Sequence, residues 1–310
     1  MSETLDAKQS EPAPADRRAL VALFAGACGI AFAPIFVRLS ELSPTATAFN
    51  RFALAVPVLW IWLFIGDAVG QSENRLRRRH PESATDFALL ALAGLFFAGD
   101  MGFWHWSITY TSVANATLLA NTAPVFVVLG GWLVFGTRVR PLFLIGMAIA
   151  MGGTVVLMQT SVALGGRHLL GDVFGLVTGL FYGAYLITIQ RLRAAYDTMA
   201  IMAYAIPISA AVVLVVSIFN GETLLASTTT GWMVVVCLAL VSQVFGQSLI
   251  AYGLAQLPVA FASVSLLVQP LMAALWAWLF LAEPLGPVQA LGAVVILTGI
   301  WIARRGSIGS

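Results

Sequence analysis

A chain of 310 residues with 60% apolar and only 10% charged side chains is too poor in charge to cover its surface with water-facing groups, because a soluble domain carries about 25% charged residues. A soluble globular protein is therefore excluded. The two cysteines, Cys28 and Cys237, both fall in apolar stretches, so we expect no disulfide framework, and no ligand spacing points to a bound metal or other cofactor.

In chain order, a polar segment comes first. Residues 1–18 contain Pro12 and Pro14 and lack the apolar core and cleavage site of a signal peptide, which predicts a disordered tail. Ten apolar stretches follow, at 19–39, 45–66, 86–111, 113–136, 140–159, 171–191, 199–219, 231–254, 259–281 and 285–303. Each can cross roughly 30 Å of hydrocarbon, and none alternates with period two. The predicted fold class is an all-α integral membrane protein with ten transmembrane helices.

Lys and Arg residues are shared unevenly between the two sides that ten crossings define. On one side fall thirteen of the sixteen, namely Lys8, Arg17, Arg18, Arg75, Arg77, Arg78, Arg79, Arg138, Arg140, Arg191, Arg193, Arg304 and Arg305. Arg38 and Arg167 fall on the other side, and Arg51 lies within the second stretch. The positive-inside rule then predicts cytoplasmic termini in a bacterial inner membrane. We interpret the basic run 75–80 as a loop beside anionic lipid rather than a nucleic-acid site.

The second half of the sequence repeats the first. Residues 112–126 align with 258–272 without a gap, so that Pro124 matches Pro270, and 52–57 align with 202–207. This predicts two five-helix repeats, at 19–159 and 171–303. A unit with an odd number of crossings must be followed by an inverted copy, and such transporters bind their substrate near mid-membrane between the halves.

Three segments carry a resemblance to a known family: ATAFNRFALAV at 46–56, ITYTSVANATLLANTAPVF at 108–126 and FLAEPLGPVQALGAVVILTGI at 280–300. They resemble the EamA family of the drug/metabolite transporter superfamily, and most of all its YddG-like amino-acid exporters. The resemblance implies a ten-helix secondary transporter that exports amino acids or related metabolites by alternating access. It also implies a cavity lined by helices 1, 3, 4, 6, 8 and 9. Thr137 departs from the family pattern, because it stands where the second repeat has Glu283.

Two charged residues fall at bilayer depth, where charges are costly and usually functional. Asp100 lies near the middle of the third stretch, and Arg51 about two turns inside the second. Asp100 is a candidate site for a proton or for the substrate ammonium. The alternatives are a buried Arg51–Asp100 ion pair or an Arg51 that extends to the membrane surface, and we interpret Arg51 as structural or gating.

Trp104 shares a helical face with Asp100 and is a candidate wall of the binding site, although packing against lipid explains it equally well. His105, five residues beyond Asp100, lies about 140° around the helix and does not share that face. His105 is a candidate binding residue that could relay protons. The alternative is a histidine that only packs.

The fourth and ninth stretches each contain a mid-span proline, Pro124 and Pro270, which should free a carbonyl one turn earlier and loosen the helix. Asn121 and Gln269 precede these prolines and are candidates for contacts with the charged groups of an amino acid. Interhelical hydrogen bonds are the alternative role for both.

Two further pairs complete the candidate binding residues. Tyr182 and Tyr185 recur at helical spacing in the sixth stretch, where an aromatic stripe can also be simple packing. Gln243 and Gln247 lie four residues apart in the eighth, and their amides must face protein or water because lipid offers no partner.

Other classes of function were weighed against export. The chain has no HExxH, GxSxG or GxxxxGK[ST] motif, so neither an enzyme nor ATP hydrolysis is expected. A drug or metabolite carrier and a nucleotide-sugar carrier share the expected fold, but a diphosphate needs several basic groups in the core and only Arg51 is available. A passive facilitator or channel stays open. The expected partners are a small-molecule substrate and the lipid bilayer.

Overall fold

The computed structural model describes residues 17–69, 80–111, 113–158, 167–282 and 285–307. The described elements are helices throughout, and they form ten spans that are long and apolar enough to cross a membrane. The fold class predicted from the sequence is therefore confirmed. The first helix begins at Arg17, and most of the predicted tail, like the run 75–79, lies outside the described residues.

The first five spans occupy residues 17–158. They consist of α1 (Arg17–Ile30) with α2 (Ala33–Leu39), α3 (Pro44–Ala68), α4 (Ala84–Tyr110), α5 (Val113–Ala120) with α6 (Ala123–Phe135), and α7 (Pro141–Met158). The other five spans are α8 (Arg167–Ala195), α9 (Thr198–Phe219), α10 (Thr229–Cys237) with η1 (Leu238–Gln247) and α11 (Ser248–Gly253), α12 (Val259–Ser265) with α13 (Val268–Leu281), and α14 (Pro287–Ser307).

Three spans are broken near their middle, each just before a proline. The breaks fall between α5 and α6 before Pro124, between α12 and α13 before Pro270, and between α1 and α2 before Pro34. Proline lacks the N–H that the helix ladder needs and clashes with the carbonyl one turn earlier. The breaks at Pro124 and Pro270 confirm the sequence prediction. The break at Pro34 and the π-helical segment η1 were not expected.

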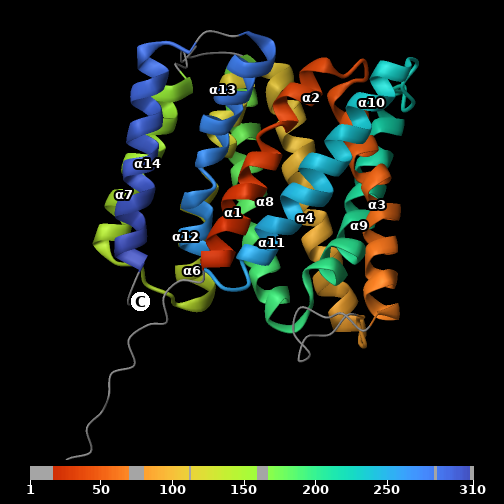
Figure 1. Cartoon of the computed structure of the whole chain (residues 1–310), viewed down its shortest axis with the longest axis horizontal. Helices are drawn as coiled ribbons and strands as arrows, with labels where there is room; N and C mark the ends of the chain where they lie inside the picture. Colours follow the sequence, from red (N-terminus) through yellow and green to blue (C-terminus); the bar gives the residue numbers. More distant parts are fainter. Residues whose placement is uncertain (1–16, 70–79, 112, 159–166, 283–284, 308–310) are drawn as a thin grey trace, which may run out of the picture.

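The helices form one bundle in which α7 and α14 lie at one edge and α3 and α9 lie toward the other (Figure 1). The central helices pack as α4 against α8 and as α1 against η1 and α11. We call the end of the bundle at which α1 begins the α1 end, and the opposite end, where α2 finishes, the α2 end; the α2 end is uppermost in Figure 1.

The outer surface of the bundle is apolar. Large side chains such as Leu133, Phe219 and Val294 are exposed on helices of both halves of the chain. Polar side chains are gathered inside instead, among them Arg51, Asp100, Gln243 and Gln247. This inverted distribution is that of a protein whose helices are solvated by lipid.

Candidate functional site

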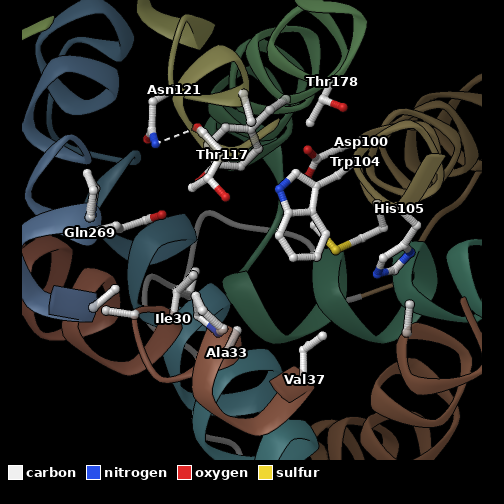
Figure 2. Close-up of a pocket in the computed structure, with 18 of the residues that line it drawn as sticks. Ile30, Ala33, Val37, Asp100, Trp104, His105, Thr117, Asn121, Thr178 and Gln269 are labelled. Carbon is white, nitrogen blue, oxygen red and sulfur yellow. Dashed lines mark hydrogen bonds between the residues drawn. The ribbon is translucent and has the colours of Figure 1, made fainter. Parts of the chain in front are cut away.

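A cavity of about 150 Å³ lies where the three broken spans face the intact helices (Figure 2). That is several times the space that one water molecule needs. Its wall takes residues from the α1–α2 break, α3, α4, the α5–α6 break, α8, η1 and α13, so both halves of the chain contribute. A broken helix exposes polar backbone that only protein or a cavity can satisfy at this depth.

Most of the binding residues expected from the sequence lie in this wall. The lining includes Asp100, Trp104, His105, Asn121, Tyr182, Gln247 and Gln269, together with Arg51 and Pro270. Tyr185, Gln243 and Pro124 are buried but are not among the lining residues. Tyr185 and Gln243 contact the lining residues Tyr182 and Arg51, so their part in binding stays a prediction. Pro124, which we interpret as structural or gating, lies at the break between α5 and α6.

Arg51 is held inside the protein and does not extend to the surface. Its side chain is 5% exposed, and its Nε donates a hydrogen bond to Gln243 Oε1 at 2.9 Å. The guanidinium also lies 6.0 Å from the ring centroid of Phe97, and one terminal nitrogen is 3.9 Å from Met101 Sδ. Gln243 is missing from the cavity wall because its amide is used to support Arg51 from behind.

Asp100 is 4% exposed and borders the same cavity. Within the part of the chain that the structure describes, its carboxylate makes no hydrogen bond and no ion pair within 4.0 Å, with Arg51 or any other cation. The direct Arg51–Asp100 ion pair that the sequence left open is thus not formed. The two side chains line one cavity without a direct contact between them.

His105 borders both this cavity and a second one at the α2 end. It is 4% exposed, its Nδ1 has no hydrogen-bond partner among the described residues, and its ring packs against that of Trp104 at 5.2 Å. The second cavity, of about 560 Å³, is also bordered by polar residues of that end: Thr45, Thr109, Tyr110, Asn220 and Glu222. Asp100 and His105 both line the first cavity although they lie on different faces of α4.

The two tyrosines of α8 have different surroundings. Tyr182 lines the cavity, whereas Tyr185 is 1% exposed and stacks on Phe97 with ring centroids 4.6 Å apart. The tyrosine rings also stack on each other at 6.2 Å. Tyr185 therefore packs behind Tyr182, which is the packing alternative that the sequence left open for this stripe.

Asn121 and Gln269 occupy the broken segments, as the prolines suggested. The Asn121 amide donates to the Thr117 carbonyl at 2.8 Å, and in the view of Figure 2 these residues lie across the cavity from Trp104 and His105. Thr117 and Met101 also border the cavity, and no pattern in the sequence singles them out. Pro34 is the sequence signal next to the third break, as Pro124 and Pro270 are next to the other two.

A polar contact ties two loops together at the α2 end. The Glu41 carboxylate, between α2 and α3, accepts hydrogen bonds from the backbone N–H groups of Thr228 and Ser227 and from the Thr228 hydroxyl. Thr228 is the N-cap of α10. The Thr228 backbone hydrogen bond is the largest of the effects that lower the pKa of Glu41 below its usual value. No cluster of three metal-ligating side chains occurs in the described ranges.

A family model described as "EamA-like transporter family" matches the chain over residues 17–159 and again over 169–305. An uncharacterized transporter from Archaeoglobus fulgidus is 26% identical over 86% of this chain and 91% of its own length. A probable terminal-alkyne amino-acid exporter from Streptantibioticus cattleyicolor is 26% identical, over 73% and 76% respectively. The pseudopaline exporter CntI from Pseudomonas aeruginosa is 21% identical, over 67% and 72%.

The fold also occurs among solved structures. One crystal structure superposes with a TM-score of 0.78 at 18% sequence identity, and the match covers 93% of this chain and 97% of the other. At this identity the likeness concerns the arrangement of helices alone.

Proposed function

The chain belongs to the EamA-like transporter family, and on this premise we propose that it exports amino acids or related small metabolites across the cytoplasmic membrane by alternating access. The observation that carries the proposal is the central cavity. It lies between the two segments that match the family, and buried Asp100 and Arg51 border it together with amide and hydroxyl groups. Charged groups at bilayer depth usually mark a substrate or ion pathway.

Contacts between α7 and α14 support two inverted repeats, here residues 19–159 and 171–303. A Cβ at Gly146 would meet Ala303, and one at Gly292 would meet Leu157. These two contacts are equivalent under the repeat, because Gly146 aligns with Gly292 and Leu157 aligns with position 303 at the offset of 146 residues. Gly153 with Ile296 and Gly299 with Ala150 form a second such pair.

In both pairs of contacts the residue number rises along α7 as it falls along α14, so these helices are antiparallel. A two-fold axis that exchanges antiparallel helices runs perpendicular to them. In a membrane-spanning bundle such an axis lies in the membrane plane, as in inverted-repeat transporters.

The two ends of the bundle suggest which access state the structure represents. The cavity extends along α2 to Val37 and shares His105 with the second cavity at the α2 end. At the α1 end the Gln190 amide of α8 donates to the Leu257 carbonyl at 3.1 Å, and Tyr196 is 1% exposed. With both termini cytoplasmic, this arrangement corresponds to a state that faces outward.

Reconstituted transport tests the proposal. The full-length protein in proteoliposomes is assayed for counterflow and efflux with a panel of labelled amino acids, with and without a pH gradient. We expect accelerated flux of at least one amino acid over protein-free vesicles. Absence of flux for every amino acid would remove amino acids as the cargo and leave the family's other metabolites.

A passive facilitator is the second reading, and the same assay separates it from a coupled exporter. Flux that accumulates substrate against its gradient when a pH gradient is imposed indicates coupling. Flux that ignores the gradient, both in the original protein and after Asp100→Asn, indicates a facilitator in which Asp100 carries no proton.

A further inference from the structure

The cavity wall carries one basic and one acidic side chain that are buried and make no direct contact with each other. Arg51 is 5% exposed and Asp100 is 4% exposed, both line the cavity, and no ion pair within 4.0 Å joins them among the described residues. An unpaired charge in a low-dielectric interior is costly, and partners that satisfy it are strongly favoured. The two groups are therefore placed to bind the opposite charges of one ligand in the cavity.

The surroundings of Arg51 fix the direction in which its guanidinium points. Gln243 Oε1 accepts the Nε–H of Arg51 at 2.9 Å, so one edge of the guanidinium is anchored outside the cavity. Its terminal nitrogens have only the soft sulfur of Met101 at 3.9 Å as a protein acceptor among the described residues. Guanidinium presents paired N–H donors that match a carboxylate. Gln243 thus acts as a positioning residue that aims Arg51.

The remainder of the wall is mainly apolar. Ile30, Val37 and Leu238 contribute aliphatic side chains, and Trp104 and Tyr182 contribute aromatic ones. Among the described residues that border the cavity there is no Lys and no acidic group besides Asp100. Such a wall favours an uncharged, apolar substituent over a third charge, because a third charge would be desolvated without a partner.

We propose that Asp100 and Arg51 recognise the ammonium and the carboxylate of one zwitterionic α-amino acid, whose apolar side chain contacts the aliphatic and aromatic wall. This rests on the proposed function and narrows it to neutral, apolar amino acids. The zwitterion brings no net charge into the bilayer and compensates both wall charges at once. A simple amine or carboxylate compensates one wall charge and leaves the other unpaired.

Competition against the unmodified protein tests the recognition directly. Counterflow of labelled leucine in proteoliposomes at neutral pH is inhibited with leucine, with leucinamide, which lacks the carboxylate, and with 4-methylpentanoate, which lacks the ammonium. Each analogue keeps the same side chain. A lost hydrogen bond to a charged group weakens binding about tenfold to a hundredfold, so we expect inhibition by each analogue to need concentrations higher by about that factor.

Variants assign each charge to its partner. We expect Arg51→Gln to weaken leucine binding and to abolish the preference for leucine over leucinamide, while Asp100→Asn abolishes the preference for leucine over 4-methylpentanoate. Arg191→Gln and Asp67→Asn are matched controls, since Arg191 stacks on Phe135 and Asp67 pairs with His80, away from the cavity. We expect both controls to keep both preferences.

Gln243→Leu provides a test that keeps both charges in place. Loss of the hydrogen bond from Arg51 to Gln243 should weaken the binding of leucine and 4-methylpentanoate more than that of leucinamide, because only a ligand with a carboxylate depends on Arg51. A general loss of folded protein would instead weaken the binding of all three ligands equally. Melting temperature in detergent is measured for every variant, and the competition on the unmodified protein stands even if a variant fails to fold.

The outcomes separate this inference from the function on which it rests. If leucine is transported but leucinamide and 4-methylpentanoate compete as well as leucine does, the recognition of a zwitterion is wrong while amino-acid export stands. If Arg51→Gln weakens leucine and leucinamide equally, Arg51 does not bind the carboxylate. If no amino acid is transported at all, the proposed function itself fails.

Discussion

At the scale of single residues, Glu41 gives the clearest pH dependence. Its carboxylate accepts hydrogen bonds from Thr228 and Ser227, and the Thr228 backbone contact is the main cause of its lowered pKa. A lowered pKa in the folded state means that the contact stabilises the protein above the usual Glu value of 4.5 and is lost as the pH falls through the lower, folded value.

The substitution Glu41→Gln should therefore lower the melting temperature slightly at neutral pH, because a neutral amide accepts these hydrogen bonds less strongly. The difference from the unmodified protein should shrink as the pH falls below about 4.5. Glu82→Gln, at the opposite end of the bundle, is the control. A difference that stays constant, or grows, toward acid pH would contradict this role of Glu41.

His105 should control passage between the two cavities that it borders. We expect His105→Trp to slow leucine counterflow by about tenfold or more, since a larger ring at the residue that borders both cavities would have to be displaced at each passage, at a cost of about one or two kcal/mol. His80→Trp, at an exposed position of the other end, is the matched control. Unchanged counterflow in a folded His105→Trp protein would show that substrate does not pass this residue.

At the scale of elements, the α7–α14 contact depends on glycine. A Cβ at Gly299 would lie 2.3 Å from the backbone nitrogen of Ala150, whereas one at Gly152, on α7 in the same layer, meets nothing within 4 Å. Backbone cannot give way as a flexible side chain can, so Gly299→Leu must push the helices apart.

We expect Gly299→Leu to destabilise the protein by about 1–3 kcal/mol, the usual cost of overpacking, or to prevent its folding. Gly152→Leu should leave the melting temperature nearly unchanged, because its side chain enters lipid. Thermal unfolding in detergent, followed by loss of the monodisperse peak, compares the two. Equal melting temperatures would mean that α7 and α14 are not in close contact.

The helices themselves were predictable because an apolar stretch must have a certain length to cross the bilayer. Ten stretches had to cross the bilayer, and the structure has ten spans at those places. The breaks at Pro124 and Pro270 followed from proline chemistry. The break before Pro34 was missed because proline is also tolerated in the first turn of a helix, the position it occupies in α2. The π-helical segment η1 has no sequence pattern of its own.

The candidate site was predictable only in part, because charge within the bilayer is visible in the sequence whereas side-chain packing is not. Asp100 and Arg51 were selected because charge at bilayer depth needs an explanation. Tyr185 and Gln243 are not among the residues that border the cavity, a distinction that the sequence pattern does not predict, because a polar residue on an inward face can border a cavity or support a residue that does. Only the packing of Phe97 on Tyr185 and the hydrogen bond from Arg51 to Gln243 distinguish these cases.

At the scale of the whole molecule, alternating access between inverted repeats requires that each half can adopt the other's arrangement. Under the proposed mechanism, the contact of Gln190 with Leu257 helps to close the α1 end in the present state. In the sequence repeat, Gln190 corresponds to Ser40 at the offset of 150 residues, and Leu257 corresponds to Thr111 at the offset of 146 residues. Ser40 and Thr111 lie at the α2 end. In the opposite state, Ser40 and Thr111 should approach each other as Gln190 and Leu257 do now.

Cysteine cross-linking in a background that lacks Cys28 and Cys237 tests this exchange. A cross-link between Gln190→Cys and Leu257→Cys should hold the present state and stop counterflow, and reduction should restore it. A cross-link between Ser40→Cys and Thr111→Cys should also stop counterflow, but it should close the α2 end, so that a water-soluble thiol reagent no longer reaches a cysteine introduced at Val37. If the Ser40–Thr111 pair never cross-links while transport proceeds, the two halves do not exchange conformations.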